Sequence, residues 1–211
     1  MTKRFTLCII LLAALLPVLI AVLLISASPS PELTLKQFTT PAVYSAWRHD
    51  GALEHMEQLR RLDVRKEGEN TRYRVEAVVD DVSGGETKKG KDYYKVELQY
   101  LLAKDSLIQS GQRAPLMDAE FQTIELLRLP LTRGARWTQA QKNALGKSVL
   151  IDCAITNLQV KNGRAVLDVT YASRDGEHYA WRRFTGGEGL TRYEKRQGEY
   201  MFGFNLFMPE K

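Results

Sequence analysis

The 211-residue chain is poor in the side chains that most often carry out chemistry or hold metals: it contains two cysteines and three histidines. Cys8 lies inside an apolar stretch and Cys153 lies in the apolar run VLIDCAI, so no disulfide between them is expected. Cys153 is predicted to be a buried core thiol, because the sequence shows no activating base or helix start beside it. His49 and His55 are six residues apart, which does not place two imidazoles on one helix face as a metal pair requires.

The sequence also lacks the common motifs of nucleotide-binding proteins and hydrolases. The phosphate-cradling spacings GxGxxG and GxxxxGK followed by Ser or Thr are absent, and so is the GxSxG turn that presents a nucleophilic serine. Asp80, Asp81 and Glu86 do not follow the ligand order of a calcium-binding EF-hand. His178 stands alone beside a turn, where a solvated or hydrogen-bonded imidazole is expected. We therefore predict no catalytic residue, no cofactor and no metal.

Positive charge is modest and dispersed. The formal charge is +5, and Lys3 and Arg4 account for two of these charges, so the remainder of the chain carries +3. The basic residues alternate with carboxylates instead of forming one concentrated basic face, which argues against nucleic acid as a partner. A mildly cationic exterior is compatible with anionic lipids or wall polymers.

One long hydrophobic run lies near the N-terminus, where residues 5–25 contain no charged side chain. A helix of about 20 apolar residues spans a bilayer, whereas the apolar region of a signal peptide is usually shorter. We therefore expect residues 1–27 to be a cytoplasmic stub and a single-pass signal anchor, with cleavage near Ala27 as the alternative. Lys3 and Arg4 would keep the N-terminus in the cytoplasm. Residues 28–41 are predicted to be a linker, and residues 42–211 an extracytoplasmic β-rich domain.

The first element of that domain is predicted to be a helix over Val43 to Leu62. Leu53, Met56, Leu59 and Leu62 recur every three residues and would form an apolar stripe that packs on a sheet.

Beyond residue 71 the apolar residues recur every second position, which indicates half-buried antiparallel strands. The runs YRVEAVV and DYYKVELQY alternate in this way on either side of a polar loop at 83–91, Leu107–Ser110 is a further candidate, and residues 120–130 are ambiguous between helix and strand. Five more strand-like runs are separated by short turn sequences such as KNG and RDG: 149–160, 164–173, 177–184, 189–196 and 199–208. The predicted fold is mainly β (α+β), an antiparallel meander that forms a curved sheet or half-barrel with one packed helix.

The stretch FTGGEGLTRYEKR at 184–196 contains three glycines followed by basic residues. A phosphate loop leads into a helix N-terminus, but here strand-like runs lie on both sides. We therefore interpret Gly186, Gly187 and Gly189 as a turn between two strands, in which Glu188 would also repel a phosphate.

The order of motifs resembles an uncharacterised extracytoplasmic β domain of anchored proteins and lipoproteins from Gram-positive-type bacteria. RLPLTRGARWTQ at 128–139 is similar to its Pro-Leu…Gly…Trp signature, and YAWRRFTGGEGLTRYEK at 179–195 is similar to its aromatic strand running into Gly-x-Gly-Leu. The matching positions are Pro130, Leu131, Gly134 and Trp137, then Tyr179, Gly187, Gly189 and Leu190. Glu188 departs from the apolar residue usual between the two glycines. The resemblance implies a fold and a location rather than a reaction, with these positions in structural roles.

Three functional hypotheses follow from these observations. The leading one is a non-catalytic binding or assembly module of the bacterial cell envelope, anchored through residues 5–25, whose partner is an envelope protein or a wall polymer. The first alternative is a carrier of a lipid or other hydrophobic ligand, which requires a continuous apolar cavity. The second is an envelope hydrolase, which requires carboxylates close to His178. Trp47, Trp137 and Trp181 either line a carbohydrate or lipid groove or belong to the core.

Overall fold

The computed structural model describes residues 33–39, 43–48, 53–81, 95–111, 121, 123–143, 146–197 and 200–206. The predicted membrane anchor, the predicted cleavage point at Ala27, Cys8 and the predicted loop at 83–91 lie outside these residues. Within them, no helix is long and apolar enough to cross a membrane. The anchor and the linker boundary at residue 28 therefore stay predictions.

The described residues form a short 3₁₀ helix, η1 (Leu35–Phe38), and twelve β-strands. The strands are β1 (Val43–Arg48), β2 (Leu53–Glu67), β3 (Asn70–Asp81), β4 (Lys95–Leu102), β5 (Ser106–Gly111), β6 (Thr123–Arg128), β7 (Arg136–Lys142), β8 (Ser148–Lys161), β9 (Arg164–Ser173), β10 (His178–Thr185), β11 (Gly189–Gln197) and β12 (Tyr200–Leu206). The prediction of a mainly β chain is confirmed, and the ambiguous segment at 120–130 contains strand β6.

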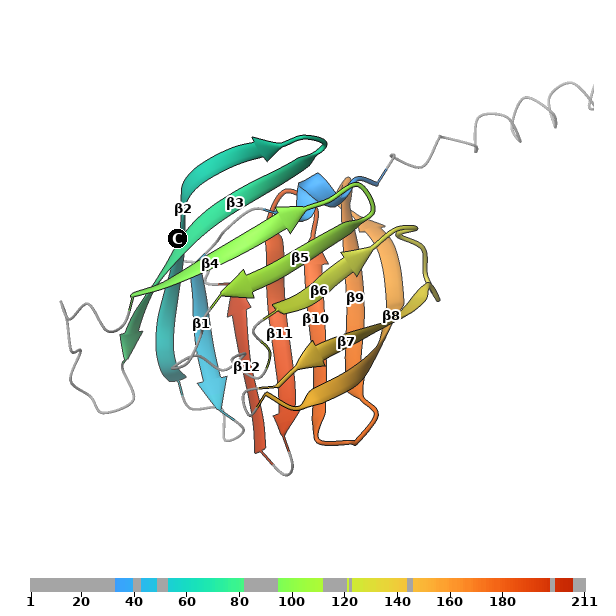
Figure 1. Cartoon of the computed structure of the whole chain (residues 1–211). Coiled ribbons are helices and arrows are strands. Elements are labelled where there is room, and N and C mark those ends of the chain that lie inside the picture. Colours follow the sequence, from blue (N-terminus) through green and yellow to red (C-terminus); the bar gives the residue numbers. More distant parts are fainter. Residues whose placement is uncertain are drawn as a thin grey trace, which may run out of the picture. The chain divides into compact units, whose positions relative to one another are not determined.

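Two antiparallel meanders make up the sheet (Figure 1). The strand order is β6-β5-β4-β3-β2-β1-β12-β11-β10-β9-β8-β7. Strands that are neighbours in sequence therefore pair, except β6 and β7 at the two ends of the order, and β1 pairs with β12 in the middle. At the opposite ends of the order, an isolated bridge between Phe121 and Asn143 links the chain beside β6 to the chain beside β7. The sheet is thus curved, and β1 and β12, the first and last strands in sequence, pair at the centre of the strand order.

One hydrophobic core serves both meanders. It combines fully buried side chains of the first meander, such as Leu98 and Leu107, with those of the second, such as Leu167 and Phe184. A polar contact also crosses this core, where the Tyr171 hydroxyl on β9 donates to the Leu126 carbonyl on β6 over 2.5 Å. Burial of about ten fully enclosed large apolar side chains is the main favourable term in the stability of such a fold.

The predicted helix over Val43 to Leu62 is wrong. This segment forms β1 and most of β2, which pair antiparallel with each other. Hydrogen bonding to β12 on one side and β3 on the other overrides the local helical pattern. A register shift between Arg61 and Asp63 also interrupts strict alternation in β2, and Leu62, predicted to pack on the sheet, is 38% exposed. An irregular strand of this kind has no clean period of two.

Helical structure among the described residues occurs instead within the predicted linker, as η1. Its Leu35 and Phe38 are buried in the common core, and the Phe38 ring meets the Phe184 ring edge-on at 6.4 Å. Spacing of three residues places both side chains on one side of a 3₁₀ turn. The segment before β1 therefore contributes to the core of the domain.

Candidate functional site

The glycine-rich stretch that suggested a phosphate loop is the turn between β10 and β11. Its backbone N–H groups already have protein partners: Gly186 N donates to Ala165 O (2.8 Å), Gly187 N to Gln37 O (2.8 Å) and Glu188 N to Thr185 O (3.0 Å). A phosphate cradle needs such groups free to meet the anion. The turn instead attaches η1 to the sheet through Gln37.

The turn requires glycine at one position and places a second glycine in close contact with η1. Gly187 has φ +82°, a left-handed conformation that side-chain-bearing residues rarely adopt. Gly186 lies against η1, and a Cβ placed there would be 2.8 Å from Oε1 of Gln37. The turn is thus shaped both to reverse the chain and to receive the 3₁₀ helix.

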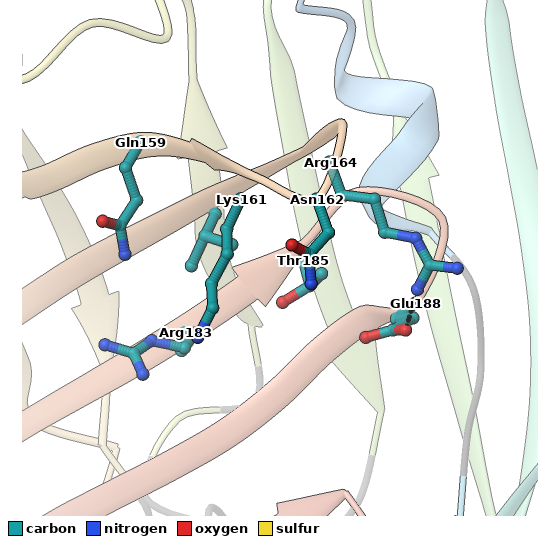
Figure 2. Close-up of a pocket in the computed structure, with 8 residues that line it drawn as sticks. Gln159, Lys161, Asn162, Arg164, Arg183, Thr185 and Glu188 are labelled. Atoms are coloured by element: carbon teal, nitrogen blue, oxygen red, sulfur yellow. Dashed lines mark hydrogen bonds and ion pairs between the residues drawn. The ribbon is translucent and has the colours of Figure 1, made fainter.

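A groove of about 470 Å³ lies beside this turn, between it and the neighbouring turn that joins β8 to β9 (Figure 2). Side chains from the ends of β8, β9 and β10 and from both turns line it: Gln159, Lys161, Asn162, Arg164, Val166, Arg183, Thr185 and Glu188. Polar and charged groups predominate, so this groove is not the apolar cavity that the carrier hypothesis predicts. Amides, a hydroxyl and cations on one concave surface are typical of a site for a polar ligand.

Positive charge exceeds negative charge in this groove, with Lys161, Arg164 and Arg183 set against Glu188. Arg164 and Glu188 form an ion pair across the two turns (Figure 2). Arg183 binds the nearly buried carboxylate of Asp168 through Nε (2.7 Å) and Nη2 (3.0 Å), and this bond raises the pKa of the guanidinium. Asp168 thereby holds Arg183 in place at the wall of the groove.

The outward face of β10 continues from the groove as an alternation of aromatic and cationic side chains. Arg183 lies over the Trp181 ring, with Cζ 5.1 Å from the ring centroid, and Arg192 of β11 lies over the same ring at 5.6 Å. One step further, Arg196 lies over the Tyr179 ring at 5.9 Å. We call these five residues, Tyr179, Trp181, Arg183, Arg192 and Arg196, the cationic–aromatic face.

Strand register explains why these side chains meet. Side chains two apart on a strand share a face, and in β10 the buried residues are His178, Ala180, Arg182 and Phe184. The intervening residues therefore face outward. Arg183 is paired with Arg192, and Tyr179 with Arg196, so the two strands place their arginines beside the β10 aromatics.

The sequence analysis treated EHYAWRRF at 177–184 as a strand and named Trp181 as a candidate groove residue, but it did not identify this face. The signal was nonetheless present, since a period of two applied to that run puts Tyr179, Trp181 and Arg183 on one side. What the sequence did not reveal was the register with β11, which brings Arg192 and Arg196 alongside.

Most residues of the family-like signature occupy turn and core positions, whereas Tyr179 is 39% exposed and belongs to the cationic–aromatic face. Leu131 and Trp137 are buried, and Leu190 packs against the same core. Gly134 and Gly189 have positive φ angles, as Gly187 does, while Pro130 is exposed. None of these residues lines the groove.

Cys153 is buried as predicted. It is 3% exposed, the Gln139 amide donates to its sulfur over 3.2 Å, and burial raises the pKa of the thiol to about 12. His178 is also buried, contrary to the solvated alternative, and its ring meets the Phe121 ring edge-on at 4.9 Å. In the part of the chain that the structure describes, no group of three His, Cys, Asp or Glu is placed to hold a metal ion.

No known family model matches the chain, and no curated protein does. Two solved structures resemble it. One, described as a candidate exported protein with a YmcC-like fold from Bacteroides fragilis NCTC 9343, has a TM-score of 0.49 and 11% identity over 81% of this chain and 97% of its own. The other, a candidate lipoprotein from Parabacteroides distasonis ATCC 8503, has a TM-score of 0.46 and 10% identity over 80% and 94%. Likenesses this distant carry no argument about function.

Proposed function

We propose that the chain is a non-catalytic, membrane-anchored binding module of the cell envelope, and that its cationic–aromatic face and the adjoining groove bind an anionic wall polymer. The polymer class is a chain of sugar or polyol units that bear phosphate or carboxylate groups. The observation that carries this proposal is Trp181 with the guanidinium groups of Arg183 and Arg192 over its ring. An aromatic ring offers an apolar surface to a sugar or polyol, while arginine binds phosphate and carboxylate with paired N–H groups.

The length of the surface favours a polymer over a single small molecule. From Tyr179 to Thr185, six residues of strand extend about 20 Å at roughly 3.3 Å each. Cationic groups accompany this whole length, from Arg196 beside Tyr179 to Lys161 and Arg164 in the groove. A repeating anionic chain would meet several of them at once, and the gain would increase with chain length.

Existing ion pairs leave these cations available to a ligand. Arg192 already contacts Glu194 at 2.6 Å and Arg164 contacts Glu188, but the arginine side chains are about half exposed. Exposed ion pairs contribute only about 0–1 kcal/mol to stability, so a polyanion can replace one partner at little cost.

The test uses the full chain in a non-ionic detergent, with alginate as the carboxylated glycan, linear polyphosphate as the phosphate polymer and dextran as the neutral polymer. Binding is measured by affinity electrophoresis. We expect retardation by at least one anionic polymer and none by dextran. Trp181→Ala and Arg192→Ala should each weaken the apparent affinity about tenfold or more, the loss expected for one charge-assisted contact.

Arg65→Ala is the matched control. Arg65 on β2 is an exposed arginine that pairs with Asp63, and it is far in sequence from the residues of the cationic–aromatic face. It removes the same charge and should bind the polymers as the unchanged protein does. Equal weakening by Arg65→Ala would show that only net charge matters, and unchanged binding by both face variants would refute the proposed site.

A further inference from the structure

A buried arginine lies on the inner face of β10, on the opposite side of that strand from the cationic–aromatic face. Arg182 is 2% exposed, and it alternates with the buried residues Ala180 and Phe184. Its Nε and Nη1 atoms have no hydrogen-bond partner among the residues that the structure describes. Buried N–H groups nearly always have an acceptor, so this exception calls for an explanation.

Two tyrosine rings are the contacts that the structure gives for this guanidinium. Arg182 Cζ lies 4.7 Å from the ring centroid of Tyr193 on β11 and 5.3 Å from that of Tyr171 on β9. These three strands lie side by side in the sheet (Figure 1). The rings provide cation–π contact but no acceptor in the plane of the N–H bonds. Trp137, edge-on to Tyr171, likewise has a buried Nε1 without an acceptor in the described part of the chain.

An arginine side chain in a protein carries a positive charge, so the burial of Arg182 is the burial of a charge. An isolated buried charge is strongly unfavourable unless an opposite charge and hydrogen bonds compensate it. The two buried carboxylates among the described residues are bound elsewhere, Glu125 to Arg128 and Asp168 to Arg183.

The unsatisfied groups of Arg182 and Trp137 are therefore all donors, and the guanidinium of Arg182 is positively charged. Such a site lacks a negatively charged hydrogen-bond acceptor. We propose that Arg182 is the centre of an internal oxyanion-binding site, which receives the carboxylate or phosphate group of a small ligand or of the head of an amphiphile. The aromatic walls of Tyr171 and Tyr193 would hold the guanidinium flat so that its N–H edge meets the anion. This site is separate from the outer polymer surface, and either proposal can fail without the other.

The test measures thermal unfolding of the full chain in a non-ionic detergent with two probes. Inorganic phosphate represents a free oxyanion, and decanoate represents an acidic amphiphile. We expect one of them to raise the unfolding temperature of the unchanged protein in a saturable manner, since a ligand bound only by the folded state stabilises it. Response to phosphate alone would identify a small-anion site, and response to decanoate would identify an amphiphile site.

Arg182→Met keeps an unbranched side chain in the core but removes the charge and all N–H donors. Its apparent affinity for the effective probe should fall about 10- to 100-fold, as expected for loss of a charge-assisted hydrogen bond. Arg182→Lys, which keeps the charge but lacks the planar guanidinium, should bind with intermediate affinity.

Two controls separate anion binding from damage to the fold and from surface effects. Tyr171→Phe keeps the ring against Arg182 but loses the hydroxyl bond to Leu126, so it should unfold at lower temperature yet keep the probe affinity. Arg65→Met removes an exposed arginine that belongs to neither proposed site and should keep it too. The proposal is overturned if neither probe stabilises the unchanged protein, or if Arg182→Met retains the same probe affinity.

Discussion

Removal of one hydroxyl group, by Tyr171→Phe, should measurably weaken the contact between the two meanders. The hydroxyl donates to the Leu126 carbonyl across the core, over 2.5 Å. Leu126 needs this donor because of the register between β5 and β6. Leu107 is paired with Leu127 and Ile108 with Glu125, so Leu126 falls at a shift where it has no strand partner.

The expected magnitude follows from leaving that buried carbonyl unsatisfied. Such a loss costs about 1–3 kcal/mol in the free energy of unfolding, because the acceptor keeps its desolvation penalty without its hydrogen bond. For a domain of this size, each kcal/mol corresponds to roughly 2–4 °C, which predicts a decrease of about 2–12 °C in Tm. The ring stays in place, so the lost apolar contact is small.

Tyr179→Phe is the matched control. Tyr179 is 39% exposed on the outer face, and removal of its hydroxyl should change the free energy of unfolding by less than about 0.5 kcal/mol. Both variants and the unchanged protein would be unfolded with urea and followed by intrinsic fluorescence. Equal midpoints and slopes for Tyr171→Phe and the unchanged protein would contradict the hydrogen bond between β9 and β6 as a source of stability.

Three further predictions test the core and the surface. Cys153 should resist iodoacetamide in the native state at pH 8, because its thiolate fraction is roughly 1000-fold below that of an exposed thiol of pKa 9, and its labelled peptide should appear in mass spectra only after unfolding. Folding raises the pKa of this thiol, so its contribution to stability is complete below pH 9 and is lost between pH 9 and about 12. Hydrogen bonds from Arg174 lower the pKa of Asp152 to about 2, so the contribution of the Asp152 carboxylate to stability is complete above pH 3.8 and is lost as the pH falls towards 2. In an NMR titration, Arg174→Met should return the pKa of Asp152 towards 3.8. Leu167→Ala, at a fully buried position of β9, should cost about 2–5 kcal/mol in urea unfolding, whereas Val160→Ala at 54% exposure should cost less than about 0.5 kcal/mol.

Where the sequence alternates cleanly, local pattern was sufficient to predict the structure. In β3, Tyr73 and Val75 are buried as the period of two requires, and the turn sequences from residue 161 onward lie where the chain reverses. Five of the six strands of the second meander, β8 to β12, were predicted from such runs, whereas β7 was not. The pattern works there because each strand buries one face and exposes the other.

The start of the first meander, β1 and β2, and the candidate site depended on information that a local pattern does not contain. β2 is paired on both sides and shifts register near Asp63, so its apolar residues repeat every three positions and suggested a helix. The closeness of Arg192 to Trp181 depends on which residues of β10 and β11 are opposite each other. Arg182 was hidden in the same way, since only the three-dimensional structure shows that the inward residue of the RR pair in YAWRRF is a buried cation.

Pairing of β1 with β12 has a consequence for the order in which the domain can be completed. Within each meander, all strand pairs join neighbours in sequence, and the chain between paired strands is short compared with that between β1 and β12. The β1–β12 pair alone joins the two ends of the described domain, about 160 residues apart in sequence, and such distant pairs form late in folding. Until β12 is available, β1 and β11 each present an unpaired edge that can recruit a strand from another chain. A chain that stops before Tyr200 should therefore be prone to aggregate even though eleven of its strands are intact, and the C-terminal strand acts as the final closure of the sheet.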